Sequence, residues 1–169
     1  MPRCARIVPP EGFLHVISRG NNRRKLFLYP RDFKFYYTLL NKLKREESIK
    51  IFHYCLMSNH VHLLLGVGEN SNLSRFMKRL NLKYFYYYRK KQAYVGHLWQ
   101  DRFRSKLIEE EAYLIQCGKY IELNPVRANI VQTPEDYPFS GNLYYAAGLD
   151  DKLIDVDPLY LDMSNTTTA

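Results

Sequence analysis

Two histidines separated by one valine, His60 and His62, are the residues of this sequence best suited to chemistry. Residues 60–67 predict a β-strand, in which side chains two positions apart project from the same face. The two imidazoles therefore point together, while the core receives Val61, Leu63 and Leu65. Two neighbouring neutral imidazoles can jointly hold a divalent metal ion. Because such pairs also arise by chance, two exposed strand histidines without a metal are the alternative interpretation.

Tyr120 and Asn124 are the second feature that could do chemistry. They lie four residues apart near the end of a predicted helix, so their side chains sit one turn above each other. A different strip of this helix is expected to pack on the sheet, and it consists of Leu114, Ile115 and Ile121. A tyrosine outside the packing strip has a hydroxyl that is free to react. The alternative is a half-buried packing tyrosine, the usual role of most of the fifteen tyrosines in the chain.

Other catalytic signatures are absent from the sequence. It contains no P-loop and no G-x-G-x-x-G, H-E-x-x-H or G-x-S-x-G segment. The three cysteines, at positions 4, 55 and 117, are odd in number and follow no zinc motif. No apolar run approaches the roughly 20 residues that cross a bilayer, and the N-terminus does not resemble a signal peptide. We therefore expect a reduced, cytoplasmic protein.

Hydrophobic periodicity predicts one α+β domain with the element order β-α-β-β-α-β-α. Strands are expected at residues 12–18, 49–57, 60–67 and within 98–108. Helices are expected from residue 30 to about 47, from a cap at Asn70 or Ser71, and from about 109 to 124, before Pro125. This order suits an antiparallel sheet flanked by helices, of ferredoxin-like or RRM-like plan. Residues 1–149 would form the domain, and 150–169 an acidic-to-polar C-terminal tail.

Strict alternation in residues 49–57 predicts which side chains share a face. It places Ile51 with His53 and Cys55 on one face, and Phe52 with Tyr54 and Leu56 on the other.

Charge indicates a nucleic-acid partner. Lys and Arg number 25 against 17 Asp and Glu, which gives a net charge of +8, and 15% of the residues are aromatic. Cations bind phosphates and aromatic rings stack on unpaired bases, so this composition favours single-stranded nucleic acid. A basic protein whose aromatic residues only fill a core is the alternative. The candidate DNA-binding residues are Arg19, Asn21, Arg23, Arg24, Arg75, Lys78, Arg79, Lys83, Trp99, Arg102, Arg104 and Arg127, with Trp99 as the stacking ring.

Four ordered segments resemble one family. Residues 54–65, which contain His60-Val61-His62, resemble the His–hydrophobic–His (HUH) motif of the Y1 single-strand transposases of IS200/IS605 type. Residues 120–128 (YIELNPVRA) resemble the tyrosine motif of the REP-associated branch of that family. Arg19-Gly20-Asn21 and residues 98–105 (LWQDRFRS) also match in order, so the resemblance extends over about residues 13–145.

The resemblance implies an antiparallel sheet flanked by helices, with metal-dependent nicking and strand transfer of single-stranded DNA. Matched by position, His60 and His62 correspond to metal ligands and Tyr120 to the nucleophile. Asn124 corresponds to the polar residue that completes the metal site. That residue is typically glutamine in the insertion-sequence branch, so Asn124 favours the REP-associated branch. Whether the protein moves its own gene is left open by this difference.

The implied chemistry agrees with the side chains. A phenol is mostly protonated at neutral pH, so it must lose its proton as it attacks. A Mg²⁺ or Mn²⁺ ion can polarise a phosphate oxygen, and tyrosine would then hold the 5′-phosphate while a 3′-OH leaves. The expected partner is single-stranded or hairpin DNA, with a monomer or homodimer acting at the nucleoid. The alternatives are an HUH replication or conjugation initiator and a non-catalytic RRM-like nucleic-acid binder.

Overall fold

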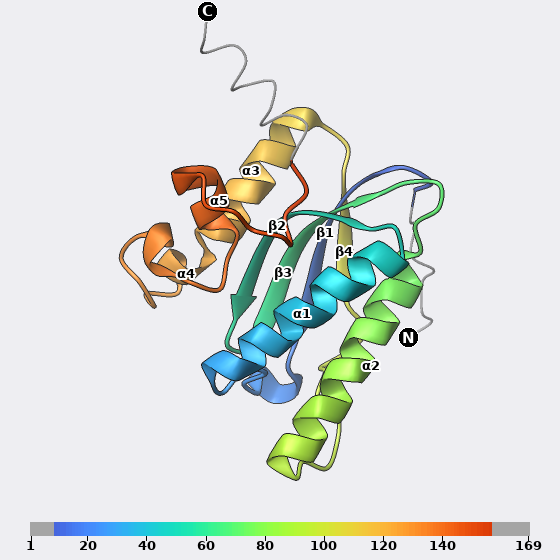
Figure 1. Cartoon of the computed structure of the whole chain (residues 1–169), viewed down its shortest axis with the longest axis vertical. Helices are drawn as coiled ribbons and strands as arrows, with labels where there is room; N and C mark the ends of the chain where they lie inside the picture. Colours follow the sequence, from blue (N-terminus) through green and yellow to red (C-terminus); the bar gives the residue numbers. More distant parts are fainter. Residues whose placement is uncertain (1–8, 157–169) are drawn as a thin grey trace, which may run out of the picture.

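Four antiparallel strands form one sheet in the order β2-β3-β1-β4, and helices cover both of its faces (Figure 1). The computed structural model describes residues 9–156. The strands are β1 (Gly12–Arg19), β2 (Lys50–Met57), β3 (His60–Val67) and β4 (Arg104–Ile108). The helices are α1 (Pro30–Glu46), α2 (Leu73–Gln92), α3 (Glu111–Glu122), α4 (Asn124–Arg127) and α5 (Asn142–Ala147), with a 3-10 turn, η1 (Asn21–Arg23). The expected α+β class is confirmed, and so is the element order through α3, whereas α4 and α5 are additional short helices.

The register of the sheet brings three distant residues to one end. Arg19 on β1 lies opposite His60 on β3, and Ile17 on β1 lies opposite Arg104 on β4. Residues directly opposite each other share a face, and so do residues two apart on one strand. Arg19, His60 and Arg104 therefore lie on the same face of the sheet, at the same end.

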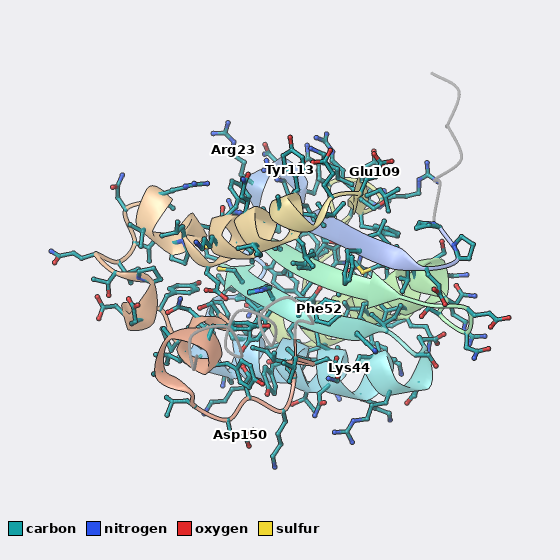
Figure 2. The ribbon with its side chains drawn as sticks, turned by 90° about the horizontal axis from the view of Figure 1, so that it is seen from above. Arg23, Lys44, Phe52, Glu109, Tyr113 and Asp150 are labelled. Carbon is teal, nitrogen blue, oxygen red and sulfur yellow. The ribbon has the colours of Figure 1, made fainter. Side chains whose placement is uncertain are left out.

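The two faces of the sheet carry separate cores. The larger core lies between one face and helices α1 and α2, and it contains Val61, Leu63 and Leu65 as expected. The smaller core lies under α3, where Leu64 packs with Leu114 and Ile121. Figure 2 shows α3 and α1 on opposite sides of the sheet. In residues 9–156, none of the helices has the length and apolar character that crossing a membrane requires.

The predicted alternation in β2 is wrong at its start, because the strand contains a β-bulge. Ile51 pairs with Leu65 and His53 pairs with Leu64, which leaves Phe52 as the extra residue. A bulge shifts the side-chain alternation by one position. Ile51 consequently lies in the larger core, whereas Phe52 joins Cys55 in the smaller one.

The N-terminal cap of α2 also differs from the prediction. Asn72 is the cap, and its side chain accepts a hydrogen bond of 2.8 Å from the backbone N–H of Arg75. The hydroxyl of Ser71 instead accepts from the Gly68 N–H and donates to the Ser48 carbonyl. Ser71 therefore closes the preceding loop, and the helix begins beyond both expected cap residues.

Residues 150–156, expected to open a polar tail, pack against the domain. Leu153 is fully buried, and Asp151 accepts hydrogen bonds from the hydroxyls of Tyr37 and Tyr54 at 2.6 and 2.7 Å. The backbone N–H of Asp155 donates to the carbonyl of Ile51. The rest of the expected tail, residues 157–169, lies outside the described residues, as does Cys4.

Candidate active site

His60 and His62 project together from β3 toward the face covered by α3, as their spacing predicts. Their ring centroids are 4.9 Å apart. His62 is only 1% exposed and His60 is half-buried, so they are not the two exposed histidines of the alternative interpretation. Strand pairing and the helix above them hold both rings in a confined space.

A third imidazole completes this group and is not among the residues that sequence patterns single out. His15 on β1 stacks on His62 with ring centroids 5.2 Å apart, and its Nε2 lies 2.9 Å from His62 Nδ1. The available signal is a histidine inside an otherwise apolar strand. Its partner depends on the pairing of β1 with β3, which local sequence does not reveal.

The three imidazoles are neutral at physiological pH. Burial and the nearby Lys106 lower the pKa of His15 to about 4. Burial and Arg19 lower the pKa of His60 to about 4, and burial with the neighbouring histidines lowers that of His62 to about 3. Neutral imidazoles keep a lone pair, which is the form that binds a metal ion.

Tyr120 lies over these histidines. Its ring centroid is 5.9 Å from that of His15 and 5.9 Å from that of His62, and its plane is nearly perpendicular to both imidazoles, at 72° and 79°. The guanidinium of Arg127 lies 4.8 Å from the Tyr120 ring centroid on another side. Tyr120 is 41% exposed, so its ring contacts the site while a large macromolecule can still reach it.

Packing and a buried polar cluster fix α3 above the sheet. Glu122 lies 2.7 Å from His53 Nδ1 through one carboxylate oxygen, and its other oxygen accepts a hydrogen bond of 2.9 Å from Asn142. The expected packing strip is confirmed for Leu114 and Ile121, which are buried, whereas Ile115 is half-buried. The helix that carries Tyr120 is thus tied to β2 and α5.

Asn124 lies beside Tyr120 but in a different helix from the one predicted. α3 ends at Glu122, and Asn124 begins the short helix α4, whose first turn accommodates Pro125. The Asn124 amide Nδ2 donates to the backbone carbonyls of Tyr120 and Ile121 at 2.8 and 3.3 Å. Among the described residues it contacts neither histidine directly. Its Oδ1 is the atom left for a ligand.

The donor set is compatible with a metal ion held by two imidazoles and an amide oxygen. In residues 9–156, no three His, Cys, Asp or Glu side chains are grouped as a metal site. His60 Nδ1 lies 2.6 Å from Asn59 Oδ1, and His62 Nδ1 is bonded to His15. Both histidines therefore have Nε2 left for coordination, with a polar partner orienting the ring.

Three of the expected DNA-binding residues gather in one cleft beside His60. Arg19, Arg102 and Arg104 line a cavity of about 200 Å³, together with Gln100 and Asp101. Residues 98–100 pair with residues 19–21 through backbone hydrogen bonds, which brings these two parts of the chain together. A cluster of guanidinium groups at this position is suited to phosphate.

A second cleft, of about 730 Å³, opens on the other side of Tyr120 between α3 and β4. Its cations are Lys106, Lys119 and Arg127. Of these, only Arg127 is expected from the sequence. Lys106 and Lys119 belong to different elements, and only the packing of α3 against β4 makes them neighbours.

The candidate DNA-binding cations of α2 lie on the face of the sheet opposite to Tyr120, because this helix packs on the larger core. Arg75 and Arg79 form ion pairs with Glu47, and Arg79 also pairs with Glu46. Lys78 and Lys83 remain exposed on this helix.

Some of the candidate DNA-binding residues in and beside η1 form contacts within the protein. The Arg24 guanidinium lies 4.4 Å from the Tyr94 ring centroid, and the Asn21 N–H donates to the Leu98 carbonyl. Arg23 is exposed and extends on the α3 side of the sheet (Figure 2). The half-buried Trp99 donates its indole N–H to the Asn81 carbonyl at 2.9 Å.

The two described cysteines do not offer a competing nucleophile. Burial raises the pKa of the Cys55 thiol well above its ordinary value. Burial also raises the pKa of Cys117 to about 11. Neither thiol forms the reactive thiolate at neutral pH.

Comparison with known proteins places this geometry in a family. A REP-associated tyrosine transposase of Haemophilus influenzae is 25% identical over 138 residues, which cover 76% of this chain and 77% of that protein. The solved structure of a REP-associated tyrosine transposase bound to a REP hairpin has the same fold, with a TM-score of 0.75. It is 21% identical and is matched over 93% of each chain. The sequence model of the IS200-like transposases matches residues 11–124. The chain belongs to the IS200-like transposase family, and both relatives come from the REP-associated branch that its motifs resemble.

Proposed function

We propose that this protein is a metal-dependent nickase and strand transferase for single-stranded DNA that folds into hairpins. The observation that carries the proposal is the position of Tyr120, with its ring 5.9 Å from both His15 and His62. A phenol with a reachable hydroxyl thus lies beside neutral imidazoles, and it lines a cleft that also contains Lys106, Lys119 and Arg127. This combination suits attack on a phosphodiester.

Tyr120 is the proposed nucleophile. Its oxygen forms a bond to the phosphorus while the bond from phosphorus to the 3′ oxygen breaks, and the phenolic proton is lost as the leaving 3′ oxygen gains one. The 5′-phosphotyrosine keeps the bond energy for rejoining, which hydrolysis would discard. Arg127 stacks on the Tyr120 ring and can orient it, since a cation held over an aromatic face restricts its rotation.

His60 and His62, through Nε2, and Asn124, through Oδ1, would hold Mg²⁺ or Mn²⁺. The bound ion would supply positive charge that polarises a non-bridging phosphate oxygen. Imidazole suits Mn²⁺ better than Mg²⁺, which prefers oxygen ligands. The hydrogen-bond partners Asn59 and His15 would keep the two ligand rings in place.

A single chain supplies every proposed part of the site, so we propose that the protein acts as a monomer. Tyr120 lies over the histidines of its own chain, and the buried pair of Glu122 with His53 holds α3 there. A mixture of Tyr120→Phe and His62→Ala proteins should then stay inactive. Restored cutting in the mixture would instead indicate a dimer that exchanges its tyrosines.

The substitution Tyr120→Phe tests the proposed function. It should abolish the covalent protein–DNA adduct on denaturing gels with a labelled hairpin oligonucleotide, while hairpin binding stays within about twofold. Tyr113→Phe is the matched control, because Tyr113 is exposed on the same helix. A persisting adduct in Tyr120→Phe would contradict the assignment. No adduct with wild-type protein in Mn²⁺ would favour a non-catalytic RRM-like binder.

The form of the substrate separates the proposal from a replication or conjugation initiator. Attack by Tyr120 needs a flexible and accessible phosphodiester, which a paired duplex does not offer. Hairpins with unpaired flanks should therefore be cut, and linear duplex of the same sequence should stay intact at physiological salt. Efficient nicking of the duplex would favour the initiator.

A further inference from the structure

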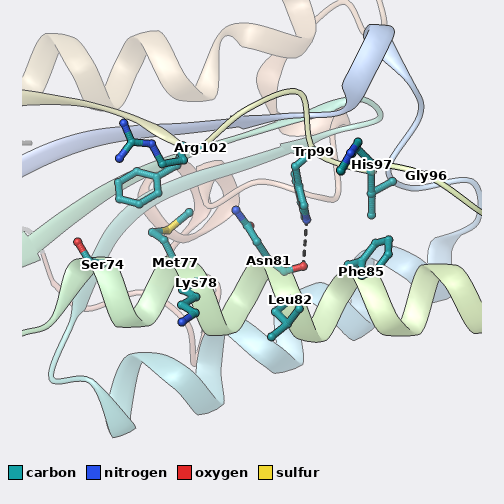
Figure 3. Close-up of a pocket in the computed structure, with 12 residues that line it drawn as sticks. Ser74, Met77, Lys78, Asn81, Leu82, Phe85, Gly96, His97, Trp99 and Arg102 are labelled. Carbon is teal, nitrogen blue, oxygen red and sulfur yellow. Dashed lines mark hydrogen bonds between the residues drawn. The ribbon is translucent and has the colours of Figure 1, made fainter. Parts of the chain in front are cut away.

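An apolar groove lies between α2 and residues 96–103, away from Tyr120 (Figure 3). Its volume is about 490 Å³, within the range of small-molecule sites. The side chains of Met77, Leu82, Phe85 and Trp99 form its walls, and Leu82 is 44% exposed. Part of this apolar surface is therefore exposed to solvent.

One polar side chain in the groove lacks a partner. The Oδ1 atom of Asn81 is buried without a hydrogen bond to any described residue. Figure 3 shows the Asn81 side chain between Met77 and Trp99. A buried unsatisfied polar atom destabilises a fold, so a ligand that bonds this amide would remove the cost. Asparagine presents a donor and an acceptor together, the pattern that pairs with the edge of a base.

The rim of the groove is cationic. Lys78 and Arg102 line it, and neither forms a salt bridge with another described residue. Arg102 also lines the cleft that contains Arg19 and Arg104 beside His60. The groove is therefore continuous, through one arginine, with the proposed path of the DNA.

We infer that the groove binds an unpaired nucleotide of the DNA substrate, with its base in the hollow lined by Leu82, Phe85 and Trp99 and its phosphate at Arg102 or Lys78. This inference rests on the proposed function, because continuity with the Arg19 cleft makes the occupant part of the same strand. A nucleotide combines a flat ring, a polar edge and an anionic phosphate. The apolar wall of the groove would contact the ring, the Asn81 amide would pair with the polar edge, and the cationic rim would bind the phosphate.

Trp99 makes the inference directly measurable. It is the only tryptophan in the chain, so intrinsic fluorescence reports on this groove. A hairpin oligonucleotide with unpaired flanking bases should quench Trp99 in a saturable way, without added metal. The same hairpin with blunt ends should bind while leaving the fluorescence unchanged.

A substitution that adds a negative charge to the wall of the groove supplies the second test. Leu82→Glu adds an anion at an exposed position, so it should weaken binding of the flanked hairpin about tenfold, the scale of one lost stacking contact. Leu149→Glu is the matched control, since Leu149 is 54% exposed on another part of the molecule. Asn81→Leu should change the preference among the four bases, which loss of apolar packing alone would not do.

The outcomes separate this inference from the proposed function. Covalent cutting without any Trp99 response would overturn the groove assignment and leave the transferase proposal intact. A Trp99 response without cutting would support the groove as a nucleotide site and count against the transferase. A response to an acidic apolar peptide, but to no oligonucleotide, would make the groove a protein-docking surface and overturn the inference.

Discussion

Gly118→Ala tests whether the position of α3 on the sheet controls the rate of DNA cutting. Gly118 lies against His53 of β2 and is two residues before Tyr120. A Cβ at this position would lie 2.6 Å from His53 Nε2 and 2.8 Å from Cε1. Ordinary contact begins near 3.4 Å, so the helix and the ring would have to separate by about 0.8 Å. His53 cannot move freely, because Glu122 holds one side and Tyr145 stacks on it at 4.3 Å.

The expected effect on stability is moderate, whereas the effect on cutting is large. Alanine gains about 1 kcal/mol over glycine in a helix, while overpacking costs about 1–3 kcal/mol. The melting temperature should therefore fall by no more than about 8 °C. A displacement of the nucleophile near 1 Å costs about 100-fold in rate. Cutting should fall by that factor while hairpin binding persists.

The assay compares the rate of covalent adduct formation under single-turnover conditions with the thermal melting curve of each variant. Gly68→Ala is the control, because it adds the same methyl group with no heavy atom within 4 Å. It should match the wild type in both measurements. Wild-type rates in Gly118→Ala would refute the reasoning, and so would a loss of rate that only follows unfolding.

Three further predictions concern the metal ligands, the third imidazole and acid stability. Replacing His60 or His62 with Ala should lower cutting at least about 100-fold, and excess chelator should do the same to the wild type, as gel assays would show. His15→Phe should weaken Mn²⁺ binding about tenfold by calorimetry without DNA, whereas His15→Gln should retain an acceptor for His62. Burial alone raises the pKa of Glu47, but hydrogen bonds from Arg79 and Arg75 lower it overall. The ionised carboxylate therefore stabilises the fold above pH 4.5, and this stabilisation is lost as the pH falls through the lowered pKa. Glu47→Gln should therefore melt a few degrees lower at pH 7, and its melting temperature should depend less on pH below 4.5.

Local patterns predict the elements that carry the chemistry. The alternation in β3 places His60 and His62 on one face, and the structure agrees because Val61 and its neighbours fill the larger core. The packing strip of α3 likewise predicts that Tyr120 lies outside the core. These predictions succeed because a strand and a helix of ordinary geometry determine which side chains share a face.

Contacts between distant segments are not predictable in this way. The bulge at Phe52 reverses the face assignment at the start of β2, and no pattern in residues 49–57 predicts it. Arg75 and Arg79 are cations on a helix surface in the sequence, yet Glu47 pairs with both of them. Each case depends on which elements lie side by side, which is set by the whole fold.

The contact between His15 and His62 is determined by the sequence, although no local pattern around His15 predicts it. Leu14 and Val16 flank it in β1 and are both buried in the larger core. A shift of one residue between β1 and β3 would remove these two side chains from the larger core and place His15 there instead. The apolar residues of β1 therefore fix the register, and the register places His15 against His62. The hydrophobic core thus determines the geometry of the polar site, although no core residue takes part in its chemistry.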